Sequence, residues 1–66
     1  MASSKQINLI GFLQGKLGIT RLTEDEEFKK EFAGSKWVGW SPSMWENWQA
    51  TRVIDYLKKR VGDNNG

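Results

Sequence analysis

Residues 36–60 read KWVGWSPSMWENWQATRVIDYLKKR, and this stretch decides the fold. It contains all four tryptophans, the single tyrosine, the single proline and the densest group of basic residues. Ser41 followed by Pro42 is typical of a helix start, because serine caps free N–H groups and proline suits the first helical position. Neither glycine nor proline recurs before Gly62. The stretch therefore predicts a Trp-bearing loop that leads into a long helix over residues 42–61.

The long predicted helix has two distinct faces. At about 100° per residue, its apolar side chains form one stripe that we expect to be core: Ala50, Val53, Ile54, Leu57 and Val61. A second, mixed aromatic and basic group lies roughly 140–160° away: Trp45, Arg52, Tyr56 and Lys59, with Trp48 close to it. An amphipathic helix needs only one apolar stripe. The second face is therefore either covered by another segment or a binding surface.

The N-terminal segment INLIGFLQGKL, residues 7–17, predicts a shorter helix over residues 6–17. Helical spacing places its aliphatic side chains on one face: Leu9, Ile10, Leu13 and Leu17. We expect Gly18 to end this helix, and residues 1–5 to be frayed because they are small and polar.

A β-hairpin is the alternative for residues 6–22. Gly11 and Gly15 weaken the helix prediction, since each costs about 1 kcal/mol relative to alanine inside a helix. The hairpin would turn at Gln14–Gly15, which is not a preferred two-residue turn. The helix is therefore the favoured interpretation.

Thr23 begins the clearest capping signal in the chain. The sequence TEDE at residues 23–26 matches the capping box, with Thr23 as N-cap and a glutamate three residues later. The acidic run also suits the positive end of the helix dipole. Phe28 and Phe32, four residues apart, supply an apolar stripe. These features predict a second helix over residues 24–33.

Together these patterns predict a mostly α-helical, small single domain of three helices, with an ordered core over about residues 6–62. A chain of 66 residues buries only about 60% of the surface that its unfolded form exposes, so this core must be small. We expect Val53, Ile54 and Leu57 to pack against apolar side chains of the two preceding helices: Leu9, Leu13, Leu17, Phe28 and Phe32.

The composition excludes several kinds of chemistry. The chain has no cysteine and no histidine, which excludes disulfides, thiolate nucleophiles, the common zinc sites and histidine acid–base catalysis. The acidic run 24–27 is explained by helix capping, and consecutive helical residues point in different directions, so they cannot converge on one metal ion. We therefore expect no enzymatic activity, no cofactor, no metal site and no small-molecule substrate.

The charge and hydropathy of the chain bear on its location. The formal net charge is +2 and the pI about 9.2, a basic excess too small to decide for nucleic acid. No apolar run approaches the roughly 18 residues of a membrane span, and the first residues do not read as a secretory signal. We expect a cytoplasmic protein with no membrane association.

Two stretches partly resemble known families. LQGKLGITRLTEDEEF, residues 13–28, resembles a helix-turn-helix around LGIT, but the acidic start of its second helix would repel phosphates. KWVGW, residues 36–40, resembles the chromodomain segment K-W-x-G-[YW], which implies that Trp37 and Trp40 form part of a cage for methylated lysine. That family requires a further aromatic residue from its first strand, and no aromatic precedes Phe12 here. Neither resemblance is adopted.

Protein recognition is the function that the sequence favours. Tryptophan, tyrosine and arginine dominate binding hot spots, and this chain concentrates them. We predict a non-enzymatic interaction module, a small regulatory or accessory protein, whose partner is another protein or a second copy. The predicted partner-binding residues are Trp37, Trp40, Trp45, Trp48, Arg52 and Tyr56. We expect Trp48 to be mostly buried and at least one of Trp37, Trp40 and Trp45 to be substantially exposed.

Nucleic-acid binding is the alternative function. The C-terminal part of the long helix is basic, and its predicted DNA- or RNA-contacting residues are Arg52, Lys58, Lys59 and Arg60. Cations at a helix C-terminus also complement the helix dipole, which explains them without a ligand. Steep salt dependence would distinguish phosphate binding from an aromatic protein interface.

Overall fold

The computed structural model describes the backbone of residues 1–65 and the side chains of residues 1–62. Residues 1–65 contain three α-helices: α1 (Ser4–Leu17), α2 (Glu26–Glu31) and α3 (Asn47–Asn65). Three short 3₁₀ helices lie between them: η1 (Leu22–Glu24), η2 (Lys36–Gly39) and η3 (Pro42–Met44). No strand occurs among residues 1–65. The mostly helical, three-helix fold is confirmed, and the hairpin alternative for residues 6–22 is wrong.

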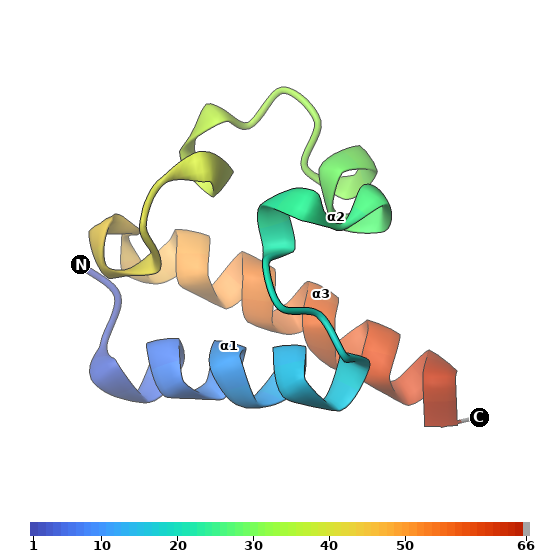
Figure 1. Ribbon diagram of the computed structural model, residues 1–66. Coiled ribbons are helices and arrows are strands. Elements are labelled where there is room, and N and C mark those ends of the chain that lie inside the picture. Colours follow the sequence, from blue (N-terminus) through green and yellow to red (C-terminus); the bar gives the residue numbers. More distant parts are fainter. Residues whose placement is uncertain (66) are drawn as a thin grey trace.

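The two long helices form the base of the molecule. Figure 1 shows α1 and α3 side by side and running in the same direction, with α2 and the 3₁₀ helices above them. Parallel neighbours cannot be joined by a tight turn, so residues 18–46 travel back along the length of the pair. This return segment covers the upper face of the two helices and supplies the third wall of the core.

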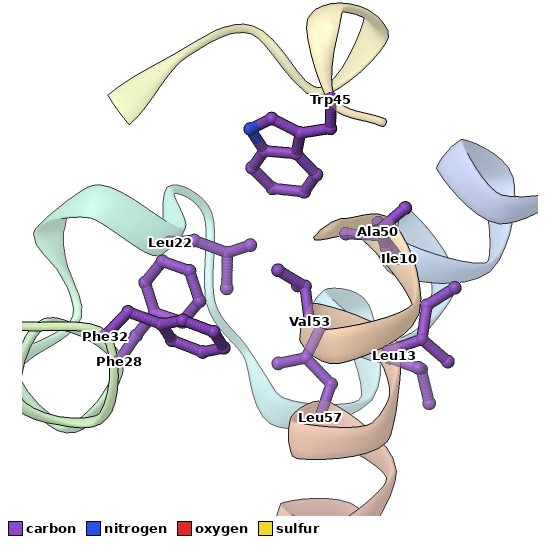
Figure 2. Packing of buried hydrophobic residues seen from close by; sticks show 10 residues of the cluster. Ile10, Leu13, Leu22, Phe28, Phe32, Trp45, Ala50, Val53 and Leu57 are labelled. Carbon is purple, nitrogen blue, oxygen red and sulfur yellow. The ribbon is translucent and has the colours of Figure 1, made fainter. Parts of the chain in front are cut away.

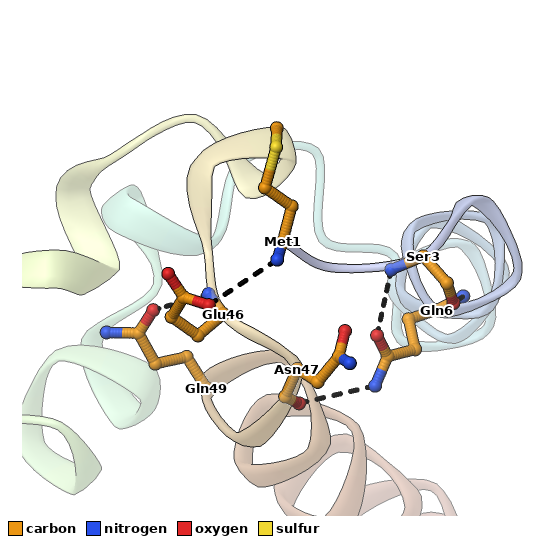
Figure 3. A network of polar contacts seen from close by, with 6 residues as sticks. All are labelled: Met1, Ser3, Gln6, Glu46, Asn47 and Gln49. Atoms are coloured by element: carbon orange, nitrogen blue, oxygen red, sulfur yellow. Dashed lines mark hydrogen bonds and ion pairs between the residues drawn. The ribbon is translucent and has the colours of Figure 1, made fainter.

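Helix α1 begins at Ser4 because Ser3 forms a capping box with Gln6. The Gln6 N–H donates to the Ser3 hydroxyl at 3.1 Å, and the Ser3 N–H donates to the Gln6 side-chain oxygen at 2.9 Å. The Gln6 amide also donates to the Asn47 carbonyl at 3.3 Å, which links α1 to the start of α3 (Figure 3). At the other end Gly18, with φ of 73°, ends α1 as predicted.

The first residues are held against the start of α3. The Ala2 N–H donates to the Trp45 carbonyl. The Met1 ammonium group lies 3.4 Å from the Glu46 carboxylate (Figure 3). The expectation that residues 1–5 are frayed is therefore wrong.

Helix α2 starts later than predicted. Asp25, not Thr23, is its N-cap, and the Asp25 carboxylate accepts the Phe28 N–H at 3.0 Å. Thr23 instead lies inside η1, so the predicted capping box does not form. The reason is tertiary: Arg60 of α3 binds the Asp25 carboxylate at 2.9 Å, which fixes this residue at the helix start.

Helix α3 also starts later than predicted. Ser41 and Pro42 begin η3 rather than the long helix. The backbone at Trp45 is extended, with φ of −71° and ψ of 147°, and α3 begins at Asn47. The Glu46 N–H donates to the buried side chain of Gln49 at 2.7 Å (Figure 3), which caps the new start. This interruption lets the Trp45 ring point inward, which a continuous helix from residue 42 would prevent.

The core lies between the helix pair and the return segment (Figure 2). The buried apolar residues are Ile10, Leu13, Leu22, Phe28, Phe32, Trp45, Ala50, Val53, Ile54 and Leu57. The expected burial of Val53, Ile54 and Leu57 with Leu13, Phe28 and Phe32 is confirmed, whereas Leu9 and Leu17 are only half-buried. Within the part of the chain that the structure describes, no helix is both long and apolar enough to cross a membrane.

Substitution of Gly11 or Gly15 by alanine should stabilise the protein. Both lie within α1, and a Cβ atom added at either would meet nothing within 4 Å. Each substitution should raise the free energy of unfolding by about 0.5–1 kcal/mol, because alanine loses less conformational entropy on folding. Gly18→Ala is the contrasting variant, since φ of 73° is strained for alanine. Urea unfolding measures both effects, and a destabilised Gly11→Ala variant would contradict the open space around α1.

Candidate functional site

Phe32 is the centre of an aromatic cluster that joins α2, η2 and α3. The centroid of its ring lies 4.7 Å from that of Phe28, 5.6 Å from that of Tyr56 and 5.8 Å from that of Trp37. The contacts with Tyr56 and Trp37 are edge-to-face, the arrangement that the charge distribution of aromatic rings favours. The cluster therefore fixes η2 above α3.

Trp37 extends this cluster to the start of α3. Its ring lies 5.6 Å from Trp45 and 5.8 Å from Trp48 between centroids, and both contacts are edge-to-face. The Trp37 carbonyl also accepts the indole N–H of Trp45 at 2.8 Å. Trp37 is half-buried, so it connects the core to the surface.

The division of the tryptophans differs in part from the sequence expectation. Trp48 is 56% exposed, so its predicted burial is wrong, while Trp45 is only 1% exposed and belongs to the core rather than to a binding face. The two side chains exchange roles because η3 turns the chain before α3 starts. Trp40 is 50% exposed, which confirms that at least one of the three other tryptophans is exposed.

Trp48, Arg52 and Tyr56 form one stripe on α3, since they are spaced four residues apart. The Arg52 guanidinium group lies over the Phe32 ring, 5.4 Å from its centroid. Together with Trp37 these residues form the α3 aromatic face, which consists of Trp37, Trp48, Arg52 and Tyr56. The structure thus brings together four of the six residues that the sequence assigned to partner binding.

An open groove of about 410 Å³ continues the α3 aromatic face toward the C-terminal end of α3. It is lined by Glu31, Phe32, Arg52, Asp55, Tyr56, Lys59 and Arg60. The sequence did not indicate Glu31, Phe32 or Asp55 as site residues. The Phe28–Phe32 spacing marked Phe32 as core, and nothing in the sequence shows that a buried ring also supports an exposed arginine.

Arg60 is engaged within the fold. Its guanidinium group lies 2.9 Å from the Asp25 carboxylate and 3.2 Å from the Glu27 carboxylate, and it donates to the Tyr56 hydroxyl at 3.1 Å. Its side chain is only 19% exposed. Of the residues predicted for nucleic-acid binding, Arg52, Lys58 and Lys59 are exposed, whereas Arg60 joins α3 to the start of α2.

The Asp25–Arg60 pair makes stability depend on pH. Burial by itself raises the pKa of Asp25, but hydrogen bonds from the Phe28 N–H and from Arg60 outweigh it, so this pKa is lower than its ordinary value of 3.8. A carboxylate whose pKa is lower in the folded chain stabilises the fold at pH values above its unfolded pKa. This contribution is lost as the pH falls through the lower, folded pKa.

Asp25→Asn should therefore flatten the acid side of the stability profile. Asparagine can still cap α2, but it removes the charge that Arg60 binds. Urea unfolding between about pH 5 and about pH 2 should give a smaller slope of unfolding free energy against pH than in the parent. Glu24→Gln, at an exposed carboxylate of η1, is the control and should keep the steeper slope. Equal slopes for the parent and Asp25→Asn would contradict this assignment.

Trp40 lies apart from the α3 aromatic face. It follows η2 and lines a second hollow together with Pro42 and Trp45.

Among the described side chains, no buried polar atom lacks a hydrogen-bond partner, and no group of three or more carboxylates could hold a metal ion. The described surface offers exposed aromatic area next to basic side chains.

Comparisons with protein-family models, curated proteins and solved structures found no match to this chain.

Proposed function

We propose that this protein is a non-enzymatic interaction module that binds another protein, or a second copy of itself, through the α3 aromatic face. The observation that carries the proposal is the exposure of Trp48, at 56%, on the first turn of the longest helix. An exposed tryptophan is unfavourable for solubility, and a partner that covers it explains its presence.

The rigidity of the α3 aromatic face supports this proposal. Trp37 holds the Trp48 ring edge-on at 5.8 Å, and the Phe32 ring supports Arg52. Tyr56 is held by its hydrogen bond from Arg60. Side chains that are ordered before binding lose less conformational entropy when a partner arrives. Tryptophan, tyrosine and arginine are also the residue types that dominate binding energy.

The setting of this activity follows from the composition. We propose a cytoplasmic location and a regulatory or accessory role, which the absence of cysteine supports because cytosolic proteins rarely depend on disulfides. The small core supports the same role, since burial of an apolar face by a partner adds stability to a small domain.

Trp48→Ala should weaken partner binding by about 2 kcal/mol or more, roughly 30-fold, while its melting temperature stays close to that of the parent. Sedimentation velocity over a concentration series tests for a second copy. Photo-crosslinking from a residue analogue at position 48 in native cells tests for another protein, and calorimetry with the purified partner then gives the affinity. Phe12→Ala, at an aromatic residue of α1 that is 59% exposed, is the matched control and should bind normally.

Two results would contradict the proposal. One is a partner whose affinity is the same for the parent and Trp48→Ala. The other is a monomer at all concentrations whose crosslinks from position 48 are no more frequent than those from position 12.

Nucleic-acid binding has less support, because Arg60 is already paired with two carboxylates. A test of this alternative should reverse only Lys58 and Lys59, since reversal of Arg60 would also break the contact between α2 and α3. If nucleic acid is the ligand, the double variant should bind far more weakly and show a shallower dependence on salt. Unchanged binding would mean that these lysines do not contact nucleic acid and serve only solubility and favourable interaction with the helix dipole.

A further inference from the structure

A second hollow, distinct from the α3 aromatic face, lies between η1 and the η2–η3 segment. It has a volume of about 360 Å³, and its apolar lining includes Leu22, Val38, Trp40, Pro42 and Trp45. We call it the Trp40 groove. Its volume is at the lower end of the roughly 300–1,000 Å³ that ligand clefts occupy, which suits a short segment rather than a whole helix.

The Trp40 groove has a firm apolar base. Leu22 and Trp45 are core residues, 8% and 1% exposed, whereas Trp40 is 50% exposed. The Trp37 carbonyl accepts both the Trp40 backbone N–H at 2.9 Å and the Trp45 indole N–H at 2.8 Å. The backbone that carries Trp40 is therefore tied to the core side chain beside it. A groove that is formed before binding loses little entropy when it is filled.

The charge of the Trp40 groove is asymmetric. Among the residues that the structure describes, Arg21 is the only charged one in its lining, and none of them is a carboxylate. Arg21 also borders a neighbouring hollow that includes Glu24 and Asp25, but Asp25 is bound by Arg60 at 2.9 Å. Among the described residues, no ion pair joins Arg21 to Glu24. A complementary occupant therefore combines an apolar group with a nearby carboxylate, because a charge left unpaired at a desolvated surface costs affinity.

We propose that the Trp40 groove binds an extended, acidic segment of a partner protein. A proline or aliphatic side chain of that segment packs against Trp40 and the base of the groove, and an adjacent carboxylate pairs with Arg21. Aromatic-lined grooves bind extended, proline-containing segments because these are already ordered when free. A single cation in the lining argues against single-stranded nucleic acid, whose backbone is followed by a groove with several cations.

The test selects binders for the full chain from a display library of short random peptides. Peptides that bind should be enriched in a proline or aliphatic residue next to aspartate or glutamate. The most enriched peptide is then synthesised with a fluorescent label, together with a form in which its acidic residue is replaced by the corresponding amide. Fluorescence polarisation gives the affinity of each form for the parent and for the variants.

Trp40→Ala should weaken binding of the selected peptide by roughly 30-fold, and Arg21→Gln by roughly tenfold. The amide form of the peptide should bind the parent protein about as weakly as the acidic form binds Arg21→Gln. Its affinity for Arg21→Gln should be little lower still, because both changes remove the same interaction. Phe12→Ala is the control and should bind normally. If Trp40→Ala does not fold, as judged by circular dichroism, the comparison of the two peptide forms with the parent and Arg21→Gln still decides the proposal.

Three results would overturn this proposal. The first is a selection without acidic enrichment, or without peptides that depend on Arg21. The second is a selected peptide that loses affinity with Trp48→Ala but not with Trp40→Ala, which would place it on the α3 aromatic face. The third is displacement of the peptide by an oligothymidylate that itself binds in an Arg21-dependent manner, which would identify the groove as a nucleic-acid site.

Discussion

Replacement of Trp45 by alanine should reduce the free energy of unfolding by about 3–5 kcal/mol, enough to unfold a domain of this size. The side chain is 1% exposed and is the largest of the fully buried ones (Figure 2). Its removal leaves a cavity, and it also removes the hydrogen bond that ties η2 to η3. The loss should therefore exceed that expected from apolar area alone.

Two further variants separate these contributions of Trp45. Trp45→Phe keeps most of the apolar volume but loses the indole N–H, so it should be less destabilising than Trp45→Ala. Trp48→Ala also removes a tryptophan side chain, but from an exposed position, and should leave the free energy of unfolding nearly unchanged. Circular dichroism and urea unfolding measure all three. Equal stability of Trp45→Ala and Trp48→Ala would contradict the assignment of Trp45 to the core.

Leu57→Ala should lose about 2–5 kcal/mol of unfolding free energy. Leu57 is 0% exposed and lies on the α3 stripe that packs against α1 and the return segment. The neighbouring substitution Lys58→Ala is the control, because Lys58 is exposed and alanine is favourable in a helix. Thermal and urea unfolding should separate the two clearly. A Leu57→Ala variant that melts within a couple of degrees of the parent would mean that the core face of α3 is assigned wrongly.

The sequence by itself determined which segments become helices and which side of α3 is buried. The predicted stripe of Ala50, Val53, Ile54, Leu57 and Val61 follows from helical spacing alone. The first four are buried, whereas Val61, near the end of α3, is only half-buried. Gly18 likewise ends α1 for a local reason, since glycine accepts a φ of 73° without strain. Such features depend on residues one or two turns apart, so the sequence is sufficient to predict them.

Only the tertiary structure decided where α2 and α3 begin. Thr23 and Asp25 are both good caps, and the contact of Asp25 with Arg60, 35 residues away, selects between them. By its residue types, Ser41–Pro42 is as plausible a start for the long helix as the observed start at Asn47. The chain instead interrupts the helix there, because an extended backbone at Trp45 is what brings this large ring into the core.

The candidate site shows the same division between local and distant causes. The spacing of Arg52 and Tyr56 on one helix face was evident from the sequence, and it places them on the α3 aromatic face. The sequence did not show which tryptophan joins them. Helical spacing was extended from α3 back to Trp45 as if the helix were continuous, and this placed Trp45 on the face of Arg52 and Tyr56. Burial of Trp45 and exposure of Trp48 follow from the extended backbone at Trp45, between η3 and α3. This interruption lies at the end of the return segment, which the parallel arrangement of α1 and α3 requires.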